Sequence, residues 1–140
     1  MRPSLIHLAA TAITTLGVVA APATPASAHG SCAGVGQALY GWFGPDSFYV
    51  TGGIECDTNH QHFDVRLCLQ VSTLPDPLSS YTNVQCNNST YDSTGKTAHY
   101  VSFTWQGGCG STLRHWRAYV SGHAGAHYHE FASPGSFQIC

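Results

Sequence analysis

Hydrophobic and polar residues alternate over several short segments of the chain, as they do in β-strands with one buried face. Period-two alternation of strand-forming residues predicts strands over 47–56, 64–71, 81–86, 97–105, 113–120 and 127–131. Turn-forming Gly, Pro, Asn and Asp separate these segments at intervals of roughly 8–12 residues, which is typical of antiparallel sandwiches and barrels. We therefore predict an all-β, antiparallel β-sandwich that is immunoglobulin-like or related to that fold.

The apolar residues that share one face of these segments form the predicted core. They are Val65, Leu67, Leu69, Val101, Phe103, Trp105, Trp116 and Val120. Two local departures from regular strands are expected. Gly52-Gly53 indicates a β-bulge inside the first strand, and 33–43 is expected to contain a turn of helix.

The first 28 residues differ from the rest of the chain in a way that indicates export. A positively charged start is followed by an apolar stretch, two prolines and the small residues Ala26-Ser27-Ala28. This order is that of a secretory signal peptide with cleavage after residue 28. The apolar stretch is shorter than the about 20 residues that a membrane span needs. We expect a secreted, extracellular protein with a signal peptide over 1–28, a single domain over 29–140 and no membrane span in the mature form.

The cysteines predict a disulfide-stapled domain, because six cysteines in a small exported chain normally pair. They are Cys32, Cys56, Cys68, Cys86, Cys109 and Cys140. The number allows many connectivities. We favour bonds between neighbours along the chain, namely Cys32–Cys56, Cys68–Cys86 and Cys109–Cys140.

The charge content narrows the class of partner. Charged residues make up 9% of the chain, and its net charge is −2 with five Lys and Arg. So few cations do not build the basic patch that nucleic-acid binding requires. The expected partner is an unidentified extracellular protein or a carbohydrate, and not a nucleic acid.

The order of the cysteine-containing strands resembles that of a known group of small proteins. The resemblance rests on Gly53-Ile54-Glu55-Cys56, the segment 65–70 around Cys68, Val84-Gln85-Cys86, and Cys109-Gly110 followed by 114–118. The group consists of secreted, cysteine-bridged, all-β proteins of actinobacterial type whose function is uncharacterised. The resemblance implies the fold and export, and it transfers no catalytic residue to this chain.

Histidines supply the first candidate site, for copper or zinc. After cleavage, His29 would offer an amino group and an imidazole to copper, or it would simply be the first residue after the cut. The pieces His60-Gln61-His62 and His127-Tyr128-His129 each place two imidazoles on one side of a strand, unless they form a polar rim. Both pieces adjoin Gly- or Asn-rich turns, where ligands are loosely held. We therefore expect micromolar or weaker affinity for Cu²⁺ and Zn²⁺ and no resident cofactor.

Aromatic residues supply the second candidate site. Tyr40, Trp42 and Phe43 lie close together in a segment that is punctuated by glycine. On an exposed loop they would stack on a sugar or anchor a protein partner. The interpretation we favour is that the segment is a plug that covers one end of the core.

Catalytic motifs are not evident in the sequence. There is no Gly-x-Ser-x-Gly elbow, and cysteines expected to be oxidised offer no thiolate. We predict no catalytic residues and a secreted, non-catalytic binding or interaction domain. The alternatives are an extracellular copper- or zinc-binding protein that uses His29 or the His-x-His pieces, and a small secreted hydrolase inhibitor that inserts 74–80 or 87–95.

Overall fold

The computed structural model describes residues 31–72, 80–107 and 112–139, so the predicted signal peptide lies outside the described residues. Within these ranges every regular element is a strand. The strands are β1 (Cys32–Tyr40), β2 (Ser47–Ser72), β3 (Tyr81–Gln106), β4 (Arg114–Ala124), β5 (His127–Ala132) and β6 (Ser136–Gln138). They pair in antiparallel fashion throughout. The predicted all-β, antiparallel fold is confirmed. The described part of the chain contains no helix with the length and apolarity that crossing a bilayer requires.

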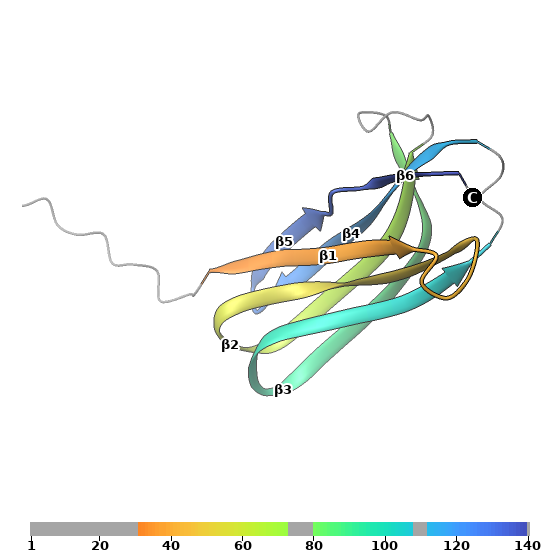
Figure 1. Cartoon of the computed structure of the whole chain (residues 1–140). Helices are drawn as coiled ribbons and strands as arrows, with labels where there is room; N and C mark the ends of the chain where they lie inside the picture. The colour runs from red at the N-terminus through yellow and green to blue at the C-terminus, as the bar shows by residue number, and fades with distance from the viewer. Residues whose placement is uncertain (1–30, 73–79, 108–111, 140) are drawn as a thin grey trace, which may run out of the picture.

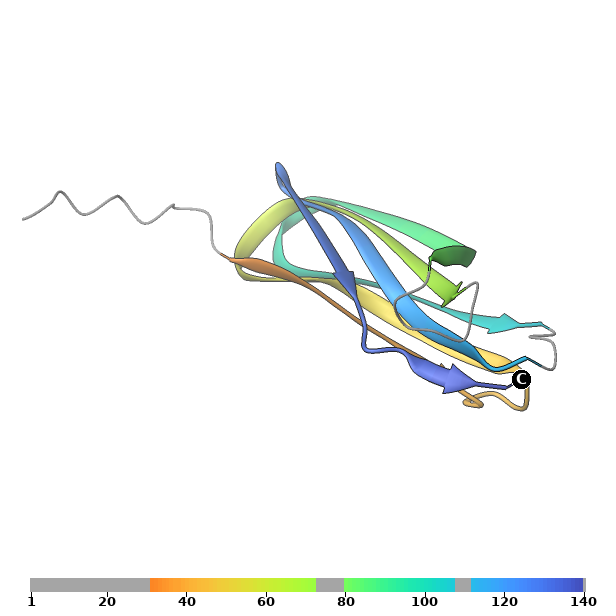
Figure 2. The ribbon, with the colours of Figure 1, turned by 90° about the horizontal axis from the view of Figure 1, so that it is seen from above.

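β2 and β3 form one long hairpin that passes through both layers of the molecule. Each strand has 26 residues, and register shifts between Glu55 and His62 mark the point where the hairpin turns back on itself. The first half of β2 and the second half of β3 therefore lie in a first layer, and their other halves lie in a second layer (Figures 1 and 2). β1 completes the first layer by pairing with β2, and β4 with β5 and β6 completes the second.

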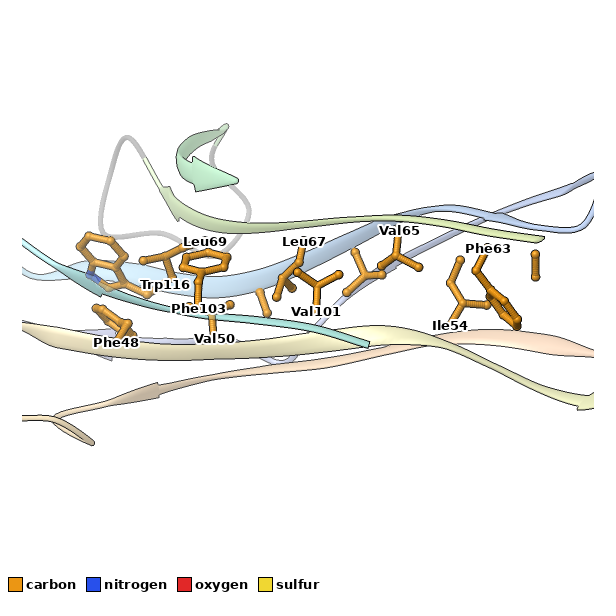
Figure 3. Packing of buried hydrophobic residues seen from close by; sticks show 13 residues of the cluster. Phe48, Val50, Ile54, Phe63, Val65, Leu67, Leu69, Val101, Phe103 and Trp116 are labelled. Carbon is orange, nitrogen blue, oxygen red and sulfur yellow. The ribbon is translucent and has the colours of Figure 1, made fainter. Parts of the chain in front are cut away.

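The hydrophobic core lies between these two layers (Figure 3). The first layer contributes Phe48, Val50, Ile54, Val101 and Phe103, and the second contributes Phe63, Val65, Leu67, Leu69, Trp116, Ala118, Val120 and Ala124. Seven of the eight predicted core residues belong to this buried set. The eighth, Trp105, is partly buried at its edge, with its ring 5.4 Å from that of Trp116.

Gly52 is a point of close approach between the layers and not the predicted bulge. β2 stays in register with β1 and β3 across Gly52 and Gly53, and its irregular segment lies further on, between Glu55 and His62. A Cβ at Gly52 would lie 2.6 Å from Cγ2 of Val120 in the opposite layer. The missing side chain thus lets the layers pack closely while the strand alternation continues.

The segment 33–43, where a turn of helix was expected, forms strand β1 and part of the following hairpin loop. β1 pairs with β2 along its whole length. A Cβ at Gly34 would lie 2.6 Å from Cβ of Phe131 on β5. Glycine disfavours a helix and permits this contact, so strand pairing outweighs the weak helical pattern.

Two of the three predicted disulfides are present. Cys32–Cys56 joins β1 to β2, and Cys68–Cys86 joins β2 to β3, in both cases between residues directly opposite in register. The bonds span 24 and 18 residues, which in the chain-entropy model corresponds to about 3 kcal/mol each. The predicted partners Cys109 and Cys140 lie outside the described residues.

Candidate functional site

The outward-facing side chains of the first layer form a three-stranded surface, which we call the outer face. Because alternate residues such as Phe48 and Val50 point into the core, the residues between them point outward. Cross-strand pairing arranges the outward residues in rows: Leu39–Tyr49–Thr104, Gln37–Thr51–Ser102, Val35–Gly53–Tyr100 and Ala33–Glu55–Ala98. Most residues in these rows are small or polar, so few large neighbours shield the aromatic rings of this face from solvent.

Tyr100 lies on β3 in the third row of the outer face, where a glycine makes room for its ring. A Cβ at Gly53 would lie 2.8 Å from Cδ1 of Tyr100, so the ring rests against bare backbone. The Tyr100 hydroxyl donates a hydrogen bond to Glu55. That bond raises the pKa of Tyr100, and burial raises it further. The side chain is thereby oriented, yet the residue remains 52% exposed.

A shallow depression lies beside the Tyr100 ring. Its volume is about 290 Å³, and its lining residues are Val35, Gly36, Gln37, Thr51, Gly52 and Tyr100. The lining therefore combines an aromatic ring with an amide and a hydroxyl, the two kinds of group that orient a bound ligand. Sequence patterns did not identify Tyr100, because its place beside Gly53 depends on the register between β2 and β3.

The hairpin loop between β1 and β2 extends this surface with further aromatic rings. Gly41 and Asp46 have positive φ angles of 73° and 56°, which let the loop reverse direction. Trp42 and Phe43 are 64% and 55% exposed. Their ring centroids lie 6.3 and 5.9 Å from that of Tyr49 on the outer face. We call Trp42, Phe43 and Tyr49 the aromatic tip.

The structure divides the predicted aromatic cluster in two. Tyr40 packs on Phe48 with ring centroids 5.2 Å apart, and so covers the end of the core as the plug interpretation expected. For Trp42 and Phe43 that interpretation is wrong, because both face solvent. The reason is the left-handed backbone at Gly41, which directs the chain away from the core.

His127 and His129 lie at the opposite end of the molecule, on the inner side of β5. Their cross-strand partners on β4 are Ala124 and Gly122, which are both buried. Phe131, the next residue on the same side of β5, packs against the core. Both histidines therefore project from a regular strand, and His127 directly follows the turn at Gly125, beside which the sequence placed this pair.

His60 lies where β2 turns from one layer to the other. Its ring centroid is 6.0 Å from that of Phe63, and its Nε2 lies 3.5 Å from Sγ of Cys32. A Cβ at Gly125, in the turn between β4 and β5, would lie 3.1 Å from its Nδ1. His60 thus stands between the first disulfide and the β4–β5 turn. We call His60, His127 and His129 the histidine group.

The remaining two candidate histidines do not join this group. His62 hydrogen-bonds through Nδ1 to Asp92, and both side chains are largely exposed. His29 lies outside the described residues. The two imidazoles of His60-Gln61-His62 do not act together, because the register of β2 shifts between them.

His129 occupies the most enclosed position in the histidine group. Its Nε2 is buried and has no hydrogen-bond partner. Burial lowers the pKa of His129, and the nearby His127, His60 and His123 lower it further. His129 is therefore neutral at pH 7, which is the form that donates a lone pair to a metal ion.

The described residues contain one close cluster of potential metal-ligand atoms. Three potential ligand atoms lie within 4.8 Å of one another only at Cys32, Cys56 and His60. The two cysteines are bonded to each other, and metals bind thiolates. That triad is therefore not a metal site as it stands.

The structure bears on one of the two segments that were predicted to insert into a hydrolase if the protein is an inhibitor. Residues 87–95 belong to β3 over their whole length and are not an exposed loop. Their pairing with the second half of β2 accounts for this, although the segment is rich in Asn and Ser. Residues 74–79 of the other segment lie outside the described residues.

A scan against protein-family models finds no match for this chain, and searches among curated proteins and among solved structures find no similar protein. The resemblance to small secreted actinobacterial proteins therefore stays a prediction.

Proposed function

We propose that this protein is a secreted, non-catalytic binding domain that holds a neutral carbohydrate chain on the outer face and the aromatic tip. The observation that carries the proposal is the exposed Tyr100 ring beside a depression that Gln37 and Thr51 help to line. Sugars present C–H faces that stack on aromatic rings and hydroxyl groups that need polar partners. The outer face offers both kinds of group within one shallow depression.

The extent of the surface supports a chain of sugar units as the ligand. Tyr49, at the aromatic tip, and Gly53, beneath Tyr100, are four residues apart on β2. At about 3.3 Å per residue, their separation is about 13 Å. A single sugar ring is comparable in size with one aromatic side chain, so a ligand that contacts both regions contains several linked units.

The charge of the surface supports a neutral ligand. Glu55 is the single ionisable acid or base in the four rows of the outer face, apart from its tyrosines. Its carboxylate already accepts the hydrogen bond from Tyr100. A charged glycan or a charged protein surface would find no complementary charge in these rows.

Export is part of the same proposal. It rests on the signal-peptide pattern in residues 1–28 and on the two described disulfides, which are typical of proteins in oxidising compartments. A secreted domain meets polysaccharides of cell walls and of the surrounding medium, which fits a carbohydrate ligand.

Binding of the processed protein to a panel of neutral polysaccharides tests the proposal. We expect depletion of the protein by at least one of cellulose, chitin, xylan or starch. Tyr100→Ala and Trp42→Ala should each weaken that binding at least tenfold, because each removes a stacking ring. The matched control is Tyr128→Ala, which removes a ring that is 56% exposed on β5, outside the outer face. Binding to none of the panel, or equal losses in all three variants, would contradict the proposal.

A further inference from the structure

We propose that His60, His127 and His129 bind one divalent transition-metal ion of the kind that prefers imidazole ligands, such as Zn²⁺. The site lies at the end of the molecule opposite the aromatic tip and is independent of carbohydrate binding. The ion would join the edge strand β5 to the bend of β2. The sequence predicted only weak metal binding by these histidines. The structure adds the approach of His60 to the β4–β5 turn and the buried, unpartnered Nε2 of His129.

The first two ligands come from consecutive inward positions of β5. His127 and His129 are two residues apart, so their Cα atoms are about 7 Å apart and their side chains leave the same side of the strand. Opposite them on β4 stand Ala124 and Gly122, which have almost no side chain. No bulky side chain of β4 therefore stands directly opposite either imidazole.

The third ligand reaches the same place from the bend of β2. The ring of His60 packs against the ring of Phe63. Phe63 in turn lies in one cross-strand row with Ala124 and His127. The backbone N–H of Gly125 donates to the carbonyl of His62 at 2.9 Å, which holds the β4–β5 turn against the bend. His60 is therefore positioned by the strands beside the turn that leads into His127.

The two nitrogens of His60 have different surroundings, and this difference indicates which one binds the ion. Nε2 faces Sγ of Cys32 at 3.5 Å, a distance that suits a weak N–H···S hydrogen bond. With the proton on Nε2, Nδ1 carries the lone pair, and this atom lies near Gly125 in the β4–β5 turn. The hydrogen bond to the disulfide thus fixes the orientation of the His60 ring, as hydrogen-bond partners of metal-binding histidines commonly do.

His129 shows why an ion would be favoured at this place. Its buried Nε2 has no hydrogen-bond partner, and an unsatisfied buried polar atom is costly. A metal ion would take up the lone pair of this nitrogen. Three imidazoles leave at least one coordination position for water, as in open zinc sites.

The ligand nitrogens of the three histidines do not all lie within 4.8 Å of one another in the structure. Among the described residues, the group that meets this distance consists of Cys32, Cys56 and His60. Binding therefore requires rotation of the β5 histidine rings about their side-chain bonds. His127 is exposed and would exchange its present interaction for the ion, while the backbone positions that the strands provide stay the same.

Calorimetric titration of the chelator-treated, processed protein with ZnCl₂ tests the proposal. We expect one ion per chain, a submicromolar Kd, and a rise of the thermal midpoint by about 5 °C at saturating Zn²⁺. His60→Ala, His127→Ala and His129→Ala should each weaken the affinity at least tenfold. His62→Ala and His29→Ala should leave it unchanged, because His62 bonds to Asp92 and neither residue belongs to the site.

A second readout keeps the test independent of folding defects in the variants. In the unmodified protein, long-range ¹H–¹⁵N spectra should show Zn²⁺-induced shifts at the imidazole nitrogens of the histidine group, with Nδ1 as the shifted nitrogen of His60. A Kd above about 10 μM would overturn the proposal. So would undiminished affinity in His60→Ala, or loss of affinity in His29→Ala alone, which would place the ion at the processed N-terminus.

Discussion

Two histidines at the edges of the core, His99 and His115, are surrounded by groups that disfavour their protonation. Nζ of Lys96 donates to Nδ1 of His99 at 3.0 Å, so the other ring nitrogen carries the proton and donates to Ser89 Oγ at 2.9 Å. Burial lowers the pKa of both histidines below the ordinary value of 6.5, and a neighbouring cation, Lys96 or Arg117, lowers it further. Folding therefore favours the neutral form of both rings.

The sign of the resulting pH dependence follows from linkage. Well above pH 6.5 both histidines are neutral in the folded and the unfolded chain. As the pH falls below 6.5, the unfolded chain binds protons first, so the free energy of unfolding decreases. Urea unfolding of metal-free protein between pH 8 and 5.5 should show this decrease, and His99→Gln should make it smaller. A stability that increases over this interval would contradict the assignment.

At the residue scale, the sequence predicted the core well and the binding surface poorly. Alternation alone places Val65 and Leu67 inside, because a strand has only two faces. Tyr100 and Thr51 could not be recognised as neighbours, since they are far apart in the sequence and meet only through strand pairing. The histidines were noticed as pairs two residues apart, but the approach of His60 to the β4–β5 turn depends on how β2 bends.

At the scale of elements, the predicted strands coincide with strands of the structure, but β2 and β3 were each divided in two, β3 into 81–86 and 97–105. The predicted strands 47–56 and 64–71 are the two halves of one strand. The polar segment between them shows no alternation, because it lies at the bend, where few side chains can reach the core. β1 was missed for a related reason. Its pairing with β2 and its glycine contacts are tertiary features that a local pattern does not contain.

The two described disulfides differ in how deeply they are buried, so we expect their removal to have different effects on stability. Cys32–Cys56 holds the start of β1 to β2 near the surface, whereas Cys68 is buried at the centre of the second layer. Replacing the first pair with alanine should cost about 2–4 kcal/mol of unfolding free energy. The Cys68→Ala, Cys86→Ala variant should lose more, because it also leaves a cavity. Denaturant titration of both variants measures the difference, and a smaller loss in the second would contradict this account.

At the scale of the whole molecule, the aromatic tip and the histidine group lie at opposite ends of one scaffold (Figure 1). The aromatic tip belongs to the β1–β2 loop, and the histidine group surrounds the bend of β2 and the β4–β5 turn. β2 runs between them, and its inward residues form much of the core (Figure 3). Each site is therefore built on strands that the core holds in place, and variants at one site should leave the other intact.

The passage of the β2–β3 hairpin through both layers also determines how the molecule opens. Neither layer can separate from the other as a unit, because each contains half of the same two strands. Amide hydrogens at Val50 in the first layer and Leu67 in the second should therefore exchange with solvent at the same free energy, that of global unfolding. Native-state hydrogen exchange measures both values, and a difference above about 1 kcal/mol would contradict a single opening unit. Proteases, which cleave opened chain, would then find few partly open forms, so resistance to digestion would follow the global stability.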